Sequence, residues 1–262
     1  MLEVISKGSA TDTHPTPLVF VHGAWHGAWC WDEHFLDYFA ERGFECHAPS
    51  LRGHAGTPGI ERLRRTRIRD YVQDLIGLLD SLPVPPVLVG HSMGGFVVQK
   101  FLERRSCAGA VLLAAIPPAG ALGATLRTAR HHPMPFLKAN AQLRLGPLVA
   151  TPDLARQLFL SATVPDAEVV GFQRRLQDES YLAYLDMVML DLVRTTRVAS
   201  VPMLVLGAEN DVIVSVREVR RTGEVYGTEA EIFPEMAHDM MLEPQWRAVA
   251  DQIAAWLDDQ GR

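Results

Sequence analysis

One serine in this 262-residue sequence lies in a pattern that would make its hydroxyl a nucleophile. Ser92 is the centre of residues 90–94, Gly-His-Ser-Met-Gly, and a third glycine, Gly95, follows directly. A serine hydroxyl attacks a carbonyl carbon poorly unless a base takes its proton, and that base needs a third group to fix its tautomer and stabilise its cation. The sequence must therefore supply both a base and an acid if Ser92 does this chemistry.

The residues around Ser92 predict a sharp turn from a strand into a helix. An apolar run typical of a strand, residues 87–89, precedes the pattern, and a helical pattern follows at once. Gly90 and Gly94 have no Cβ, so neighbouring chain can pass close to them while the serine adopts a strained conformation. The turn lifts the hydroxyl clear of the sheet and aims the free N–H groups of the helix at the reacting carbon. The alternative is an ordinary turn in which Ser92 only caps the helix.

A Gly-x-Ser-x-Gly pattern between a strand and a helix is a nucleophile elbow, and on these residues the sequence resembles the α/β-hydrolase fold family. In that family the serine is followed along the chain by an acid and then a histidine, each just past a late strand. The resemblance implies that Asp211 is the acid and His238 the base. Glu209 is the competing acid but lies closer to the strand, and residues 114–117, where some members place the acid, contain no carboxylate. Taken singly, Asp211 is also a common turn residue and His238 a common loop residue.

The same resemblance implies an oxyanion hole, two backbone N–H groups that receive the negative charge of the tetrahedral state. One N–H belongs to Met93, directly after the nucleophile. The other belongs to Ala24, because residues 22–24, His-Gly-Ala, resemble the His-Gly motif of the family. His22 is expected to brace this loop by hydrogen bonds rather than to act in the reaction. The side chain of Trp25 is expected to reach the pocket that holds the acyl group.

The longer string over residues 22–31, His-Gly-Ala-Trp-His-Gly-Ala-Trp-Cys-Trp, resembles the branch that contains plant methylesterases and hydroxynitrile lyases. Trp29 and Trp31 are expected to pack in the core. The plant lyases carry Thr where this chain has Gly23, and Lys directly after the catalytic histidine, where this chain has Asp239. Because that Lys stabilises the leaving cyanide, these departures favour an esterase over a lyase. Asp239 itself is interpreted as a solvated residue.

The elements that must position these residues alternate between strand and helix. Strands are predicted over residues 2–6, 18–21, 44–48, 87–89, 110–114, 203–207 and 231–233, the first of them at an edge. Helices are predicted over residues 32–42, 68–82 and 93–105, from 215, and over 244–257. This alternation predicts an α/β protein with a mainly parallel, doubly wound sheet and helices on both faces.

Between residues 119 and 199 the alternation stops. This stretch is helix-like and rich in apolar side chains, and prolines interrupt it at Pro133, Pro135, Pro147, Pro152 and Pro165. We interpret it as a helical cap inserted into the sheet domain. Residues 1–118 and 200–262 then form the two parts of the α/β-hydrolase core.

Composition narrows the classes of protein to consider. Hydrophobic residues make up 48% of the chain, and the formal net charge of −6 argues against nucleic acid as a partner. Cys30, Cys46 and Cys107 have no Cys-x-x-Cys spacing and predict buried thiols in a reducing compartment. Residues 1–7 do not resemble a signal peptide, and no apolar run reaches transmembrane length, so we expect a cytoplasmic protein without a membrane span. The oligomeric state, monomer or homo-oligomer, stays open.

Two further clusters are interpreted without a catalytic role. Five arginines between residues 62 and 69 predict a solvated face, with a phosphate or membrane-surface contact as the alternative. The adjacent His131 and His132 lack the spacing of zinc ligands, so no metal is expected. No Walker loop or Gly-x-Gly-x-x-Gly follows a strand, so no cofactor is expected either.

Together the residues and the resemblance predict a serine hydrolase that cleaves a small to medium hydrophobic carboxylic ester through an acyl-enzyme intermediate. Two alternatives stay open. One is a carbon–carbon bond or thioester hydrolase with the same triad, and the other is a ligand receptor on this fold with slow turnover. Serine at residue 92 argues against epoxide hydrolases and haloalkane dehalogenases, which need a carboxylate nucleophile. The cap decides the substrate, and its side-chain directions do not follow from the sequence.

Overall fold

The computed structural model describes residues 1–261, and within them the chain forms one seven-stranded sheet. The strands are β1 Val4–Lys7, β2 Leu18–Val21, β3 Cys46–Pro49, β4 Val87–His91, β5 Gly109–Leu113, β6 Met203–Ala208 and β7 Ala230–Phe233. Their order across the sheet is β1-β3-β2-β4-β5-β6-β7, and β1 pairs antiparallel with β3 while the other neighbours pair in parallel. The predicted α/β class and the edge position of the first strand are confirmed.

The three central strands are buried along their whole length. Every residue of β2, β4 and β5 is buried, whereas β1 at the edge is partly exposed. A parallel strand covered by helices on both faces needs apolar side chains in both directions, which explains the continuous apolar runs in the sequence. The central strand β4 ends at His91, directly before Ser92, so the sheet positions this serine.

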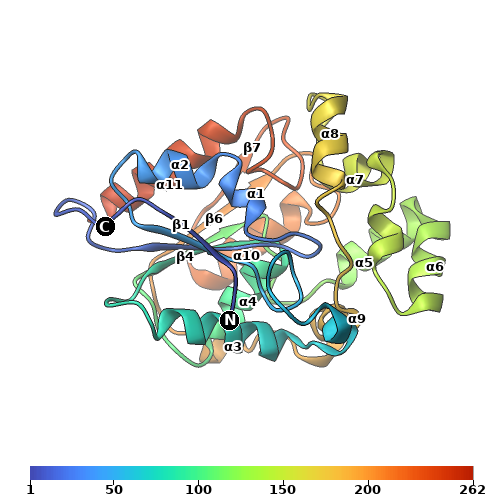
Figure 1. Cartoon of the computed structure of the whole chain (residues 1–262), viewed down its shortest axis with the longest axis horizontal. Helices are drawn as coiled ribbons and strands as arrows, with labels where there is room; N and C mark the ends of the chain where they lie inside the picture. The colour runs from blue at the N-terminus through green and yellow to red at the C-terminus, as the bar shows by residue number, and fades with distance from the viewer. Residues whose placement is uncertain (262) are drawn as a thin grey trace.

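Helices cover both faces of this sheet. Outside residues 119–199 they are α1 Trp29–Asp32, α2 Phe35–Ala40, η1 Ile60–Arg65, α3 Ile68–Leu79, α4 Met93–Leu102, α10 Val216–Tyr226 and α11 Trp246–Asp259. Helices α1, α2 and α11 lie on one face, and α3 and α4 lie on the other (Figure 1). This arrangement is the doubly wound sheet that the alternating pattern predicted.

Several of the predicted helix boundaries were wrong, among them the end of α4, which lies at Leu102 rather than at residue 105. A single helix over residues 32–42 is replaced by α1 and α2, because His34 leaves the helical conformation (φ −146°, ψ −48°) and its ring stacks on Trp246 at 4.7 Å. Helix α3 ends at Leu79 rather than Leu82. The prolines that begin at Pro83 explain the early end, since a residue before proline is disfavoured in helical conformation.

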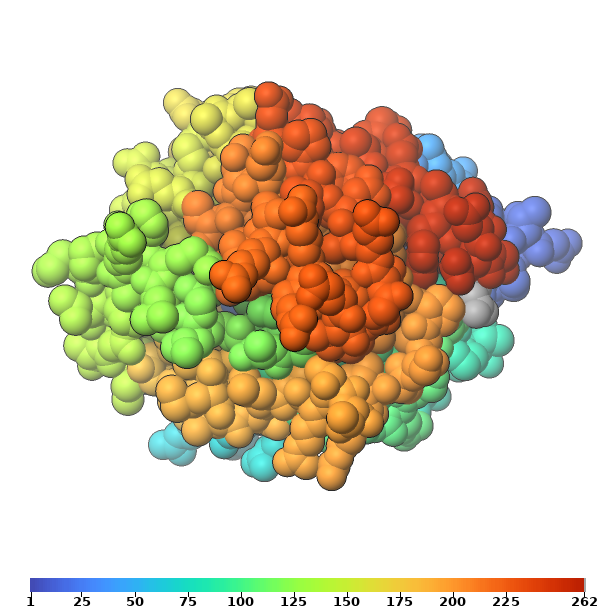
Figure 2. All heavy atoms as spheres, turned by 180° about the vertical axis from the view of Figure 1, so that it is seen from behind, coloured from blue at the N-terminus to red at the C-terminus, as the bar shows by residue number. Residues whose placement is uncertain are grey.

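Residues 119–199, which we call the helical insertion, contain no strand and connect β5 to β6. Its elements are α5 Leu122–His131, α6 Pro133–Gln142, η2 Gly146–Val149, α7 Pro152–Phe159, α8 Asp166–Gln173, α9 Tyr181–Leu185, η3 Asp186–Leu190 and η4 Thr195–Arg197. Pro133 and Pro152 begin the helices α6 and α7 instead of interrupting them. Proline fits the first turn of a helix, because the backbone N–H that it lacks has no hydrogen-bond partner within the helix at that position. The insertion forms one end of the molecule, with α6 outermost (Figures 1 and 2).

None of the helices in residues 1–261 has the length and apolar character needed to cross a bilayer. The thiols of Cys30, Cys46 and Cys107 are all buried and form no disulfide, as the spacing of the cysteines predicted.

Candidate active site

Ser92 lies in a strained turn between β4 and α4. Its backbone has φ 51° and ψ −118°, a conformation that non-glycine residues rarely adopt. Close backbone contacts explain the flanking glycines: a Cβ on Gly94 would lie 2.2 Å from the carbonyl oxygen of Val21, and one on Gly90 would lie 2.7 Å from the Cα of Gly95. The predicted turn and the reason for its glycines are therefore confirmed by the backbone.

The Ser92 hydroxyl is the end of a buried hydrogen-bonded chain. Its Oγ lies 2.9 Å from Nε2 of His238, and Nδ1 of His238 lies 2.7 Å from Oδ2 of Asp211. A carboxylate only accepts hydrogen bonds, so Nδ1 carries the proton and Nε2 is left to accept from the Ser92 hydroxyl. Asp211 and His238 follow β6 and β7, and the parallel strands bring them to the same edge of the sheet as Ser92.

The surroundings of Asp211 and His238 fix their orientation and charge. The other oxygen of Asp211 accepts the N–H groups of Ile213 at 2.7 Å and Val214 at 2.9 Å, so the carboxylate cannot rotate away from the histidine without losing both bonds. Burial opposes the charged form of His238, but the Asp211 carboxylate outweighs burial and raises the pKa of His238 above its ordinary value of 6.5. A cation on this ring is therefore stabilised where a proton from Ser92 would arrive.

Glu209, the competing acid, points elsewhere. It is exposed, and its carboxylate accepts the backbone N–H of Glu235 at 3.2 Å. The structure thus brings Asp211, and not Glu209, to His238.

The loop after β2 lies directly against the serine. His22 is buried, its Nε2 accepts the N–H of Leu51 at 3.0 Å, and its Nδ1 donates to the carbonyl of Gly23 at 2.8 Å. Burial and the neighbouring His54 lower the pKa of His22, which keeps the ring neutral for these two bonds. A Cβ on Gly23 would lie 3.0 Å from the Cβ of Ser92, so this position is packed against the turn.

A buried carboxylate that the sequence analysis missed ties this loop to the helical insertion. Glu179 accepts the backbone N–H of Trp25 at 3.3 Å, Nε2 of His54 at 3.0 Å and the hydroxyl of Tyr71 at 2.7 Å. Gln177 also donates its backbone N–H to the carbonyl of Trp25 at 3.0 Å. Burial opposes a charge on His54, but Glu179 outweighs it and raises the pKa of His54. A histidine in the glycine-rich loop at 51–59 was the one sequence signal for this cluster.

Asp239 is not the solvated residue that the sequence analysis expected. It is 2% exposed, and its Oδ2 lies 3.0 Å from Nε2 of His26. Burial opposes its ionisation, but the attraction of His26 outweighs burial and lowers the pKa of Asp239. The prediction was wrong because the chain turns inward after His238, and the following Met240 and Met241 are buried as well.

His91 completes this second buried group. Its Nε2 donates to the carbonyl of His238 at 3.0 Å and lies 3.6 Å from Oδ1 of Asp239. Burial and the adjacent His238 ring lower the pKa of His91 to about 3, so the ring is neutral. His91, His238 and Asp239 offer ligand atoms within 4.8 Å of one another, but both nitrogens of His238 are already engaged by Ser92 and Asp211. The hydrogen-bonding arrangement therefore does not fit a metal.

An apolar cavity of about 70 Å³ opens above Ser92. Ala24, Trp25, Met93, Ile116 and Ile213 of the sheet domain line it together with Ser92, and the helical insertion lines the rest. Thr125, Thr128, Asn140 and Tyr184 are its polar lining residues on the insertion, and the Tyr184 hydroxyl is bonded to Thr125 at 3.2 Å. Trp25 and Ser92 line the same cavity, while Trp29 and Trp31 are buried in the core.

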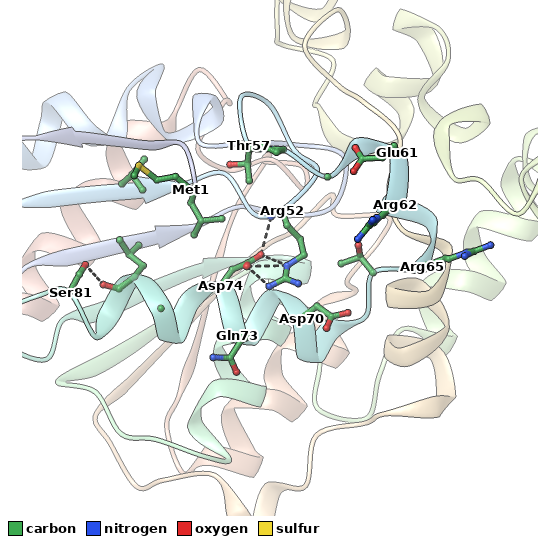
Figure 3. A pocket seen from close by; sticks show the side chains of 17 residues that line it. Met1, Arg52, Thr57, Glu61, Arg62, Arg65, Asp70, Gln73, Asp74 and Ser81 are labelled. Atoms are coloured by element: carbon green, nitrogen blue, oxygen red, sulfur yellow. Dashed lines mark hydrogen bonds and ion pairs between the residues drawn. The ribbon is translucent and has the colours of Figure 1, made fainter.

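A larger groove of about 1080 Å³ lies along α3 and η1 and contains none of these groups. Arg52 and Asp74 pair in it at 2.5 Å, and Arg62 and Arg65 line its rim (Figure 3).

The five arginines between residues 62 and 69, the basic run, were predicted to form a solvated face. Arg67 differs from the other four, because its guanidinium pairs with the buried carboxylate of Asp186.

A strained elbow serine on a mainly parallel sheet, bonded to a histidine past the last strand, defines the α/β-hydrolase class. The sequence matches the Alpha/beta hydrolase family over residues 18–252, and the chain belongs to this family. The predicted family is therefore confirmed.

Individual relatives are similar over part of the chain. Pheophorbidase from Raphanus sativus is 38% identical over 101 residues, 37% of this chain and 36% of that protein. Methyl jasmonate esterase 1 from Vitis vinifera is 36% identical over 88 residues, 33% of each chain. The chain matches only about a third of the length of these curated relatives. The solved monoacylglycerol lipase of Paleococcus ferrophilus superposes with a TM-score of 0.72 at 22% identity over 99% of both chains, which shows the shared fold.

Proposed function

We propose that this protein hydrolyses carboxylic esters with Ser92 as nucleophile, His238 as general base and acid, and Asp211 as the group that orients the histidine. The observation that carries the proposal is the continuous Asp211–His238–Ser92 chain, with separations of 2.7 and 2.9 Å, at the floor of an apolar cavity. The relatives that are named esterases support the same reaction.

In the proposed reaction His238 Nε2 takes the proton of Ser92 as its Oγ attacks the ester carbonyl. The new oxyanion lies between the N–H groups of Met93, at the start of α4, and Ala24, in the loop braced by His22. His238 then protonates the leaving alcohol. Water, activated by the same histidine, attacks the acyl-serine and releases the acid. The pKa of His238, raised by Asp211, favours the imidazolium that forms in both halves of the reaction.

We further propose that the helical insertion, residues 119–199, acts as a cap on a core formed by residues 1–118 and 200–262. Support comes from the cavity, whose walls opposite Ser92 belong to α5, α6, α9 and the residues around them. The cavity is mostly apolar, so its substrate is an ester with small to medium hydrophobic groups. Trp25 lines this cavity together with Ser92, and we propose that it contacts the acyl part of the substrate.

Lyase chemistry is not proposed. The residue after His238, the proposed base, is Asp239. Burial opposes the ionisation of Asp239, but the attraction of His26 is stronger and lowers the pKa of Asp239. Asp239 is buried against His26 and does not line the cavity, so this position supplies no cation that could stabilise a leaving cyanide.

The test is hydrolysis of p-nitrophenyl esters from acetate to long-chain acyl groups, with Ser92→Ala measured beside the wild type. We expect kcat to fall by about 10⁶-fold in the variant, because only substrate binding and the oxyanion hole then accelerate hydrolysis. The acyl length with the highest kcat/KM gives the size of the cavity. Full activity in Ser92→Ala would contradict the proposal.

A further inference from the structure

The outer faces of α5 and α6 expose large apolar side chains. Leu122 and Leu126 on α5 are 51% and 62% exposed, and Met134 and Leu137 on α6 are 72% and 60% exposed. In a soluble monomer, exposed apolar residues are usually scattered, and a group on adjoining elements marks an interaction site. The two helices follow one another in the chain and are separated only by His132.

These exposed residues are not the cavity-lining ones. On α5 the cavity is lined by Ala124, Thr125 and Thr128, whereas Leu122, Leu126 and Arg130 recur every four residues on another stripe of the helix. None of the residues of α5 is fully buried. The helix therefore has one face for the cavity and a second apolar face with no partner in residues 1–261.

The apolar surface continues beyond the two helices. Met189 and Leu190 are also exposed, and Leu192 is partly so. A Cβ placed on Gly120 would lie 2.5 Å from Cδ2 of Leu192, which puts Leu192 against the start of α5. These exposed leucines and methionines all belong to the helical insertion, which forms one end of the molecule (Figure 2).

The charge of this region is opposite to that of the whole chain. The chain carries a net charge of −6, but residues 117–152 contain no Asp or Glu and four Lys or Arg. Arg127 and Arg144 are paired with Glu218 and Asp178. Arg130 and Lys138 are exposed and form no ion pair within the described residues. Both lie beside the exposed apolar side chains, because Arg130 follows Leu126 by one helical turn and Lys138 follows Leu137 directly.

We propose that this surface, the α5–α6 face formed by Leu122, Leu126, Arg130, Met134, Leu137 and Lys138, docks on a lipid bilayer that contains anionic headgroups. Apolar side chains flanked by cations, on helices that do not span the bilayer, are the combination that binds an anionic membrane surface. A second copy fits less well. A symmetric contact would place Arg130 and Lys138 against the same cations, with no carboxylate from residues 117–152 to neutralise them.

The test measures binding of the full chain to vesicles by co-sedimentation, at low and high salt. Phosphatidylcholine vesicles are compared with vesicles that also contain phosphatidylglycerol. We expect binding to the anionic vesicles, weakened by salt, and much weaker binding to phosphatidylcholine alone. The Ser92→Ala variant is expected to bind as the wild type does, so this result is independent of the proposed esterase activity.

Two double variants separate the apolar and charged parts. Arg130→Gln with Lys138→Gln is expected to weaken anionic binding by about fivefold for each cation removed. Leu126→Ser with Met134→Ser is expected to weaken it at both salt concentrations. The matched control, Arg64→Gln with Arg69→Gln, removes two exposed cations from η1 and α3, and binding is expected to stay unchanged.

Three results would overturn the proposal. The first is equal binding to both kinds of vesicle or to neither. The second is a control variant that loses as much binding as Arg130→Gln with Lys138→Gln, which would place the lipid contact on the basic run. The third is a wild-type dimer in sedimentation that Leu126→Ser with Met134→Ser converts to a monomer, because a second copy would then cover the face. Unchanged melting temperatures show that the variants fold.

Discussion

Two consecutive residues, His238 and Asp239, each belong to a buried histidine–carboxylate pair, and the two pairs differ in what they face. His238 pairs with Asp211 and presents its other nitrogen to the hydroxyl of Ser92 at the cavity. Asp239 turns to the opposite side, where it pairs with His26 and lies near the neutral ring of His91. A histidine and an aspartate thus form one pair beside the cavity, His238 with Asp211, and a second pair enclosed in the core, His26 with Asp239.

The proposed function gives the first pair a role in the reaction, and the contacts of the second pair indicate a structural role. Both pairs are buried, and both have short contacts. The Asp211 pair is hydrogen-bonded to Ser92, the proposed nucleophile, so the Ser92 proton can pass to His238. The Asp239 pair has instead His91 beside it, and His91 donates to the carbonyl of His238 and so ties the loop that carries His238 to the end of β4. We therefore expect substitutions in the first pair to reduce activity and substitutions in the second to reduce stability.

Among the substitutions in the two pairs, the largest effect is expected for Asp211→Asn. The amide would no longer hold the His238 tautomer in which Nε2 accepts, and it would not stabilise the imidazolium. We expect kcat to fall by about 10⁴-fold, with much less change in the free energy of unfolding. Ester hydrolysis under saturating substrate measures this.

Glu209→Gln is the matched control for Asp211→Asn, since Glu209 is an exposed carboxylate two residues away on the same loop. Its activity is expected to equal that of the wild type. If Glu209→Gln lost activity while Asp211→Asn kept it, the assignment of the acid would be wrong.

The second pair is tested by Asp239→Ala. Removing one partner of a buried ion pair leaves His26 without its carboxylate, and His91 loses a neighbouring negative charge. We expect the free energy of unfolding to fall by about 3–5 kcal/mol. Urea denaturation at neutral pH measures the change.

Asp239→Asn keeps the shape and one hydrogen-bond acceptor, so its loss of stability is expected to be smaller than that of Asp239→Ala. Asp258→Ala removes an exposed carboxylate at the end of α11 and is expected to change stability by less than about 0.5 kcal/mol. A stability of Asp239→Ala equal to that of the wild type would show that the second pair has no structural role.

The sequence was sufficient to predict the parts of the site that depend on local geometry. Ser92 was found because the strand, the glycines and the helix are neighbours in the chain. The side chains Asp211 and His238 were placed only with the help of the order typical of the family. The structure adds the distances that join them to Ser92.

The sequence was not sufficient for contacts between distant segments. His26 and Asp239 are 213 residues apart, and His54 and Glu179 are 125 apart, so no local period or spacing connects them. One signal for Asp239 was available, since the apolar residues after it, Met240 and Met241, indicate a buried turn. The outer face of α5 was missed for a related reason. A leucine on a helix is normally expected to be buried, and only the structure shows that another face of α5 lines the cavity while these leucines are exposed.

The smallest expected effect links the two pairs through the pH dependence of hydrolysis. His238 must be neutral to accept the serine proton, so kcat/KM rises with pH through the pKa of this histidine. Burial opposes the charged ring, but Asp211 and, to a smaller extent, Asp239 raise that pKa, which places the acid limb of the wild type above 6.5. Asp239→Asn removes one of these negative charges, and we expect the limb to move to lower pH. Glu209→Gln removes a solvent-screened charge and is expected to leave the limb in place. A limb that stays fixed or moves upward in Asp239→Asn would mean that the second pair acts on stability alone.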